Sequence, residues 1–186
     1  MALPAKQLTL ELVPHCTSVT RDGWTSDDDL RPLAELGRRQ ATALVAAIGT
    51  EVDGIFSSPA VRCRQTVEPL AATLGLPVQD LAGLYEAADF GEPAAGREGF
   101  SDLMVRAIGG AWAAGRMLGA VTVMMDACPG GRTVAASHGD VIPVLLATLS
   151  SAFAVPTPGP VDRGGWYTLH FGPGGLAVTP HNAVPV

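Results

Sequence analysis

Short apolar segments alternate with segments of helical spacing along most of this chain. The apolar segments predict four short strands, at Leu8–Val13, Gly54–Phe56, Pro77–Leu81 and Arg132–Ala136. Pro14 ends the first of them, because proline has no N–H to donate to a ladder. Such an alternation favours a parallel or mixed sheet covered by helices on both faces.

The segments between these strands have helical periodicity. They predict helices at Pro32–Ile48, Ala60–Leu74, roughly 101–119 and Val141–Ser150, the first two ended by Gly49 and Gly75. Residues 85–100 form a polar, insertion-like loop, and Pro156–Gly165 is an exposed connection rich in proline and glycine. Two further strands are predicted near the end of the chain, at Trp166–Phe171 and Leu176–Thr179.

Composition limits what this chain can bind. Its 186 residues are 47% hydrophobic and only 16% charged, which predicts a single folded domain over 1–186. A net charge of −6 argues against general binding of nucleic acids or anionic membranes. Lys6 is the only lysine, so an anionic ligand would have to be held by a local cluster of arginines.

Cysteine usage and the N-terminus favour a reduced compartment. Cys16, Cys63 and Cys128 are too few and too scattered for a disulfide framework, and no CxxC pair suggests zinc. The first residues do not resemble a signal peptide. The stretch from Ile108 to Cys128 carries charged residues and is interpreted as a buried helix and its connection. We therefore expect a cytoplasmic protein without a membrane span, and the apolar bias allows a homodimer.

Polar residues follow three of the predicted strands. His15 follows the first strand, Ser57-Ser58-Pro59 the second, and Ser137-His138-Gly139 a later one. Ligands of open α/β sheets bind beyond the carboxyl ends of the strands. The topology therefore predicts that these residues converge on one edge of the sheet.

Two histidines near one point suit phosphoryl transfer. One imidazole can attack phosphorus and become a phosphohistidine, while the other stabilises charge on the transferred group. The same pair could bind a metal, but the sequence shows no third ligand of suitable type and spacing. Surface or structural roles are expected for His170 and His181.

Three further side chains are candidates for the same site. Arg62 lies in the first turn of the second helix, where a guanidinium beside main-chain N–H groups forms a phosphate cradle. Arg21 lies in the loop after His15 and could fold back over the site. Glu86 follows the third strand and could protonate a leaving oxygen, although a solvated loop carboxylate is an equally good reading.

Two sequence blocks have a specific order and spacing. The block S-S-P-x-x-R-x-x-Q-T-x-E spans Ser57–Glu68, and R-P-L-x-x-x-G-R-x-Q-A spans Arg31–Ala41. Together with the segments LELVPHCTS and VAASHGDVIPVLL, they resemble the histidine phosphatase superfamily, which is phosphoglycerate-mutase-like, over essentially the whole chain. The short length and the segment Arg21–Leu33 resemble the small bacterial phosphohistidine-phosphatase branch, which includes phosphatase domains fused to Nudix domains.

The resemblance implies an α/β fold of the three-layer αβα sandwich type with a mostly parallel central sheet. It implies a nucleophile at His15 with Arg62, His138 and Glu86 as catalytic partners, and no metal or cofactor. Arg21 and Ser58 are expected to bind substrate. The substrate would be a small phosphorylated molecule or a phosphohistidine protein, and a mutase would need an insertion for which this chain has little room.

The first family motif departs from its pattern. Where the family has Arg-His-Gly, this chain reads Pro14-His15-Cys16, so the arginine that grips the phosphoryl group is missing. One charge-assisted contact contributes roughly 1.5–3 kcal/mol, so activity should fall about ten- to a thousand-fold unless Arg21 or another guanidinium substitutes. Cys16 could crowd the phosphate site or act as an alternative nucleophile.

Two hypotheses follow from these residues. The leading one is a phosphohydrolase, acting on phosphomonoesters or phosphohistidine through a phosphohistidine intermediate on His15. The alternative is a catalytically impaired relative that binds an anionic ligand or a protein partner. Pro14 favours the second hypothesis, whereas the joint presence of His15, Arg62, His138 and Glu86 favours the first.

Overall fold

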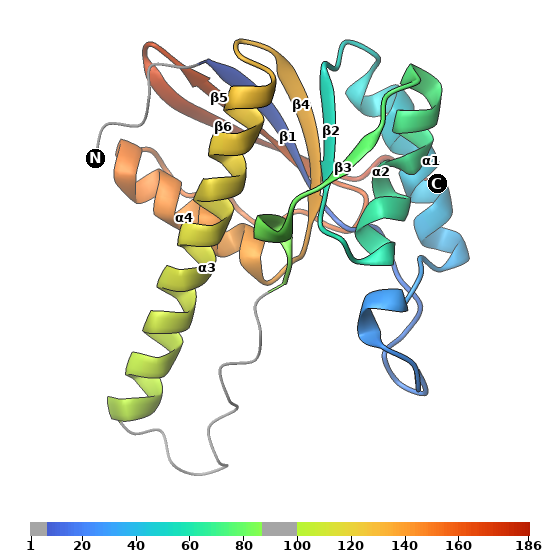
Figure 1. Ribbon diagram of the computed structural model, residues 1–186, viewed down its shortest axis with the longest axis horizontal. Coiled ribbons are helices and arrows are strands. Elements are labelled where there is room, and N and C mark those ends of the chain that lie inside the picture. The colour runs from blue at the N-terminus through green and yellow to red at the C-terminus, as the bar shows by residue number, and fades with distance from the viewer. Residues whose placement is uncertain (1–6, 87–99) are drawn as a thin grey trace.

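A single six-stranded sheet forms the centre of the molecule (Figure 1). The computed structural model describes residues 7–86 and 100–186. The strand order is β3-β2-β4-β1-β5-β6, with β1 at Leu8–Pro14, β2 at Gly54–Ser57, β3 at Val78–Asp80, β4 at Arg132–Ser137, β5 at Trp166–Gly172 and β6 at Gly175–His181. The first four pair in parallel, and only the pairings of β5 are antiparallel. The expected mostly parallel sheet is therefore confirmed.

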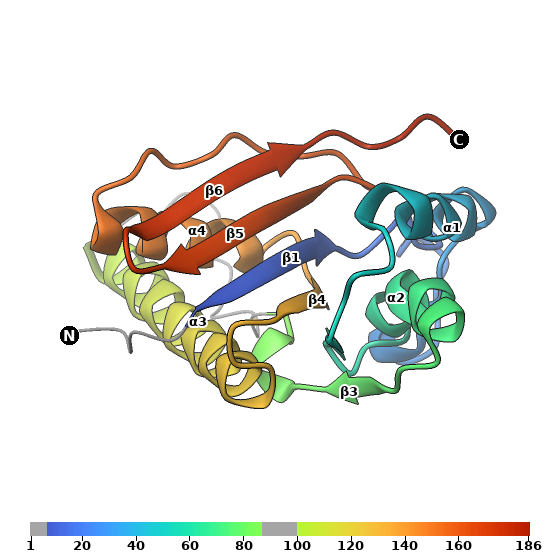
Figure 2. The same ribbon diagram turned by 90° about the horizontal axis from the view of Figure 1, so that it is seen from above.

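Helices cover both faces of this sheet, as Figure 2 shows from above. They are α1 at Glu35–Ile48, α2 at Val61–Leu74, α3 at Phe100–Ala127 and α4 at Val141–Phe153, with 3₁₀ turns at Asp28–Leu30 and Ala82–Leu84. One apolar cluster joins the sheet to α1 and α2, and a second joins it to α3 and α4. The three-layer αβα sandwich is therefore confirmed.

The alternation of side chains in the strands produces the two apolar layers. Leu8, Leu10 and Leu12 of β1 pack toward α3 and α4, whereas Val13 packs toward α1 and α2. Successive strand residues point to opposite faces, so a strand buried on both faces is apolar almost throughout. Position 14 falls on the same face as Leu12, toward α3 and α4.

Two predicted boundaries are wrong near the start of the chain. Strand β1 continues to Pro14, which pairs with Ser137 of β4. Proline is tolerated there because the ladder to β5 already ends at Leu12, so no donor is needed on that side. Helix α1 begins at Glu35, later than expected, because Leu33 is held in an isolated bridge with Ser18.

Helix α3 is longer than the predicted 101–119 and continues to Ala127. Its last turns bury Met117, Val121 and Met124 against the sheet, and this packing extends the helix past its glycines. The part from Ala107 to Ala127 is long and apolar enough to cross a membrane by length and composition alone. A buried core helix meets the same criterion. Most of the predicted loop 85–100 lies outside the described residues.

Candidate active site

Three strand ends bring their polar residues together. β1, β4 and β2 are neighbours in the sheet and run in parallel, so His15, His138 and Ser58 emerge at the same edge. The rings of His15 and His138 lie 5.6 Å apart between centroids, in an edge-to-face arrangement. Ser58 Oγ lies 2.8 Å from Nε2 of His138. The predicted convergence is confirmed.

His15 is held as one defined tautomer. Its Nδ1 donates a hydrogen bond to the carbonyl oxygen of Cys16 at 2.8 Å, which leaves Nε2 without a hydrogen. Burial, together with the positive charges of Arg163, Arg62 and Arg31, lowers the pKa of His15 to about 3. The imidazole is therefore neutral near pH 7, with the lone pair of Nε2 available for attack.

His138 is the second buried imidazole. Its Nδ1 lies 3.4 Å from Nη2 of Arg62 and 3.5 Å from Oε2 of Glu86. Burial, followed by the charge of Arg62, lowers the pKa of His138 to about 2. Binding of a dianionic phosphate would favour protonation of this ring, and a protonated ring stabilises charge on a transferred phosphoryl group.

Arg62 is fully buried and ion-paired, although the sequence predicts it as a phosphate cradle. Its Nη2 lies 2.9 Å from Oε2 of Glu86 and 3.4 Å from Oδ2 of Asp28, and Nη1 donates to the Asp28 carbonyl at 2.7 Å. Its Nε is buried and has no hydrogen-bond partner among the described residues. Two carboxylates therefore form ion pairs with the guanidinium that the resemblance assigns to phosphate binding.

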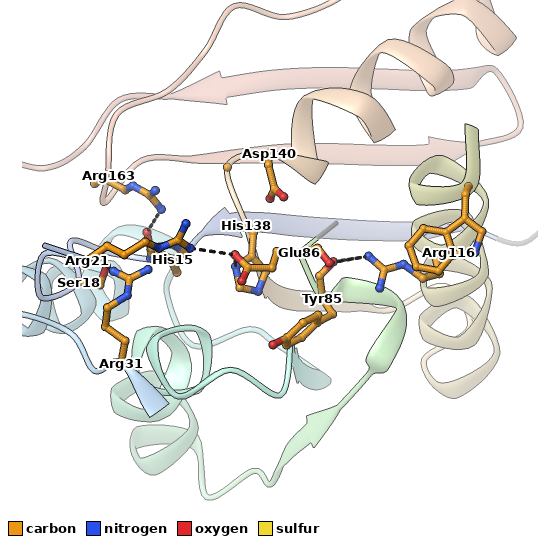
Figure 3. A pocket seen from close by; sticks show the side chains of 12 residues that line it. His15, Ser18, Arg21, Arg31, Tyr85, Glu86, Arg116, His138, Asp140 and Arg163 are labelled. Carbon is orange, nitrogen blue, oxygen red and sulfur yellow. Dashed lines mark hydrogen bonds and ion pairs between the residues drawn. The ribbon is translucent and has the colours of Figure 1, made fainter. Parts of the chain in front are cut away.

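A cavity of about 810 Å³ opens at this edge of the sheet (Figure 3). Its lining comprises His15, Ser18, Arg21, Arg31, Tyr85, Glu86, Trp112, Arg116, His138, Gly139, Asp140 and Arg163. Four of the residues predicted from the sequence are among them: His15, His138, Glu86 and Arg21. The other two, Arg62 and Ser58, lie behind this lining in the described part of the structure, both with 0% exposure.

Asp28 organises three arginines at one side of the cavity. Arg21 donates to both of its carboxylate oxygens, and Arg31 donates to Oδ1 at 2.8 Å. The hydrogen bond from Arg31, followed by that from Arg21, holds the pKa of Asp28 well below its ordinary value. The sequence showed Asp28 only as one of three consecutive aspartates, with no sign of this role.

Two arginines of the lining were not predicted. Arg163 precedes β5 and donates through Nη1 to the carbonyl oxygen of His15 at 2.6 Å. Arg116 of α3 donates to the carbonyl oxygen of Glu86 at 3.1 Å, and its guanidinium stacks 4.3 Å from the ring of Trp112. Helical spacing puts Trp112 and Arg116 on one face, which is the only signal that the sequence offered for this pair.

Residues of the two family motifs hold the loop that follows His15. Thr66 accepts a hydrogen bond from the main-chain N–H of Cys16 at 2.9 Å, and Gln65 accepts one from that of Leu33 at 2.8 Å. Gln40 accepts one from the main-chain N–H of Thr17 at 3.0 Å. These motif residues therefore position the loop that carries His15 from α1 and α2.

Cys16 does not crowd the cavity, contrary to the expectation from the sequence. Its side chain is fully buried in the apolar cluster under α1 and α2. Burial raises the pKa of Cys16 to about 11, so the thiol stays protonated and is a poor nucleophile. The structure therefore favours His15 over Cys16 as the attacking group.

The described residues hold no candidate metal cluster, and the two remaining histidines lie away from the cavity. Within residues 7–86 and 100–186, no group of three or more His, Cys, Asp or Glu side chains is placed to hold a metal ion. His170 is exposed on β5 and lies 3.1 Å from the hydroxyl of Thr9, while His181 stacks on Trp166 with 4.5 Å between centroids. Both belong to the β5–β6 end of the sheet and not to the cavity.

Part of the chain matches a known protein family. The family model "Histidine phosphatase superfamily (branch 1)" matches residues 15–98. An 8-oxo-(d)GTP phosphatase of Mycolicibacterium smegmatis is 42% identical over 74 residues, which are 38% of this chain and 22% of that protein. The match thus spans about a fifth of that relative's length.

Solved structures share the fold at low sequence identity. A phosphoglycerate mutase from Bacillus anthracis has a TM-score of 0.71 at 17% identity, covering 96% of this chain and 94% of that chain. A mycobacterial glucosyl-3-phosphoglycerate phosphatase has a TM-score of 0.67 at 21% identity, covering 96% of this chain and 99% of that chain. The protein histidine phosphatase SixA, complexed with tungstate, has a TM-score of 0.59 at 19% identity, covering 94% of this chain and 96% of that chain. Residues 15–98 therefore match the histidine phosphatase superfamily, and the described part of the chain shares the fold of these solved phosphatase and mutase structures.

Proposed function

We propose that this protein is a phosphohydrolase that acts through a phosphohistidine intermediate on His15. One observation carries the proposal: the hydrogen bond from Nδ1 of His15 to the Cys16 carbonyl leaves Nε2 unprotonated on a ring that lines the cavity. A neutral, oriented imidazole is a competent nucleophile toward phosphorus. The surrounding arginines supply positive charge for phosphoryl transfer, and a bound dianion would favour protonation of His138 as well.

The reaction has two steps. Nε2 of His15 forms a bond to phosphorus while the bond from phosphorus to the leaving oxygen breaks, and that oxygen takes a proton. Water then attacks the phosphohistidine, which releases inorganic phosphate and restores the imidazole. Glu86 lines the cavity beside His138 and is our candidate for the acid in the first step and the base in the second.

Glu86 must also give way to the substrate. Its carboxylate lies against Arg62 and His138, the two groups that a phosphoryl group would contact. Arg116 binds the main-chain oxygen of Glu86, so the side chain can rotate while its backbone stays in place. Displacement by the more highly charged phosphate would move the carboxyl group toward the leaving oxygen.

The cavity favours a small phosphorylated molecule as the substrate. Its volume of about 810 Å³ lies within the range of small-molecule sites, roughly 300–1,000 Å³. The relatives act on chemically different phosphorylated compounds, to judge from their names, so they narrow the substrate only to a phosphoryl donor. A phosphohistidine protein remains the second substrate class, with the imidazole of its phosphohistidine as the leaving group.

A catalytically impaired binding protein is the second candidate function. Pro14 supplies no guanidinium, and Arg62 is already paired with Glu86 and Asp28. Both facts weaken the positive charge available to a phosphoryl group. Such a protein would hold an anion or a protein partner in the same cavity without turning it over.

Hydrolysis assays separate these two functions. We would measure release of phosphate from p-nitrophenyl phosphate and from a phosphohistidine peptide by the wild type, His15→Ala and Pro14→Arg, with His170→Ala as the control histidine. Acid-quenched mass spectra would test for phosphate on His15. Turnover that is lost only in His15→Ala supports the hydrolase. An inert wild type that gains activity in Pro14→Arg supports the impaired relative.

A further inference from the structure

We propose that Arg163 supplies the phosphate-binding guanidinium beside the nucleophile that position 14 lacks. The assignment rests on the proposed function, since it names a further catalytic residue for the same site. Arg163 belongs to the connection before β5, far in sequence from the motifs around His15. Its place in the cavity carries the inference.

The guanidinium of Arg163 lies between the two histidine-bearing strand ends. Nη1 donates to the main-chain oxygen of His15 at 2.6 Å, as Figure 3 shows. Nη2 lies beside Gly139, 3.7 Å from where a Cβ on that glycine would stand. Arg163 lines the cavity together with His15 and His138. A phosphoryl group on Nε2 of His15 would therefore form close to this guanidinium.

Arg163 differs in its partner from the three arginines that surround Asp28. Arg21, Arg31 and Arg62 each contact the carboxylate of Asp28. Arg163 instead donates to a neutral carbonyl oxygen, as Arg116 does, but its partner is the main-chain oxygen of His15 itself. Its charge is felt by both histidines, whose pKa values it helps to lower. This charge is therefore placed to attract an anion without first breaking an ion pair with Asp28.

Burial makes an anionic partner favourable for Arg163. The pKa of Arg163 is lowered, and burial is the largest cause, with the charges of Arg31 and Arg62 adding to it. A guanidinium that has lost part of its hydration next to other cations is stabilised by a bound dianion. Arginine also offers two parallel donors, which match the oxygens of a phosphoryl group.

The backbone around Arg163 is fixed from the nucleophile side. The side-chain amide of Gln40 donates to the carbonyl oxygen of Arg163 at 2.8 Å, and its oxygen accepts from the N–H of Thr17 at 3.0 Å. One buried side chain thus sets the loop after His15 and the turn that carries Arg163. Gly164 has φ +90°, and a Cβ there would lie 3.1 Å from Gln40, so glycine permits this close approach.

Position 14 and Arg163 reach the same cavity from different elements. The side chain at position 14 points to the α3 and α4 face, where Arg116 and Asp140 line the cavity. An arginine at position 14 would enter the cavity there. The assignment therefore predicts that an arginine at either position can serve the phosphoryl group, so one should rescue the loss of the other.

The test compares the wild type with three variants. They are Arg163→Met, Arg163→Lys and the double variant that combines Arg163→Met with Pro14→Arg. Arg64→Met is the matched control, because Arg64 pairs with Asp80 outside the cavity. Calorimetry measures tungstate binding, and p-nitrophenyl phosphate is the substrate for turnover. Thermal melting shows whether each variant is folded. We expect Arg163→Met to weaken tungstate binding about 10- to 150-fold, corresponding to one charge-assisted contact. Arg163→Lys should retain part of the affinity.

The results distinguish this assignment from the proposed function. Recovery of at least tenfold in tungstate affinity on adding Pro14→Arg supports it, and so does intermediate affinity in a folded Arg163→Lys. Unchanged tungstate affinity in Arg163→Met overturns the assignment, even where turnover falls, and so does a wild type that binds no tungstate. A wild type without turnover whose tungstate affinity still depends on Arg163 refutes the hydrolase alone.

Discussion

The carboxylate of Glu86 lies 2.9 Å from Nη2 of Arg62 and 3.5 Å from Nδ1 of His138. A carboxylate thus contacts two of the groups that the superfamily resemblance assigns to phosphate. Because Arg62 is fully buried, this pairing also balances a charge that is costly to leave alone in the interior. Glu86 therefore has two roles, neutralising the buried charge of Arg62 and transferring a proton in the proposed reaction. A substitution can separate these roles.

Glu86→Gln should change catalysis in a way that depends on the leaving group. The amide keeps a similar shape but carries no charge and no transferable acid proton. We expect turnover of an alkyl phosphate to fall about 10²- to 10⁴-fold, the usual contribution of general acid catalysis. Transfer of the phosphoryl group to His15 from p-nitrophenyl phosphate, whose leaving group needs no proton, should change less than about tenfold. Single-turnover kinetics with both substrates measures this first step apart from the hydrolysis of the phosphohistidine, which is common to both.

Glu35→Gln is the matched control, because Glu35 pairs with Arg38 on the surface of α1. Tungstate should bind more tightly to Glu86→Gln than to this control, since the competing charge has gone. An equal loss in the single-turnover rate of the first step on both substrates would contradict the acid role of Glu86.

Thr66→Val should destabilise the protein and slow the reaction together. The Thr66 hydroxyl accepts from the N–H of Cys16 and donates to the Arg62 carbonyl at 2.8 Å, inside the core. Valine has the same shape but leaves the buried N–H without a partner, which costs about 1–3 kcal/mol. Urea unfolding measures the loss of stability, and kcat with p-nitrophenyl phosphate reports the displaced His15 loop.

Thr73→Val tests whether this effect belongs to the loop or to the helix. Thr73 lies on the same helix, and its hydroxyl also donates one turn back, to Pro69, but on the exposed side. We expect its effect on unfolding to stay within about 0.5 kcal/mol. Equal losses for the two variants would contradict the role assigned to Thr66.

Periodicity and motif order predicted the layers of the fold and the meeting of the two histidines. Both depend on local patterns: strands of apolar residues, and polar residues placed directly after them. His15 and His138 follow adjacent parallel strands, so their meeting is a consequence of the sheet order. The start of α1 was missed because a tertiary contact decided it, the bridge between Ser18 and Leu33.

The charge arrangement of the site could not be predicted in the same way. Arg163 approaches His15 across 148 positions, through a turn whose sequence is typical of any exposed connection. Arg62 was expected to face phosphate because its helix position suits one, and the structure pairs it with Glu86 and Asp28 instead. Long-range ion pairs depend on side-chain geometry that no local pattern encodes.

Gly37→Ala should damage the site through a steric contact. A Cβ at Gly37 would lie within a bond-like distance of the carbonyl oxygen of Thr17, so α1 and the His15 loop must separate. Overpacking of this kind costs about 1–3 kcal/mol or more. Gly115→Ala in α3 is the control, since nothing lies within 4 Å of its Cβ position. Alanine there should instead stabilise the helix by about 0.5–1 kcal/mol. Thermal melts that move in the same direction would contradict this account.

Acid should destabilise the folded protein through the two histidines that line the cavity. The folded-state pKa values of His15 and His138 are lowered to about 3 and about 2, from an ordinary value of 6.5. Between these values and 6.5 the unfolded chain binds protons that the folded chain refuses, so stability falls as the pH drops below 6.5. Each histidine contributes a slope of up to about 1.4 kcal/mol per pH unit.

The pKa of Asp28 is also lowered, but from an ordinary value of 3.8, so its stabilising effect is fully present above pH 3.8 and is lost only at lower pH. The histidines therefore dominate between pH 6.5 and 4. Urea unfolding of wild type, His15→Asn and His138→Asn across this window should show a shallower dependence in each variant, with about one proton fewer taken up on unfolding. His170→Asn, an exposed histidine on β5, is the control. A His15→Asn variant that keeps the full wild-type dependence would show that the buried imidazole is protonated in the folded state.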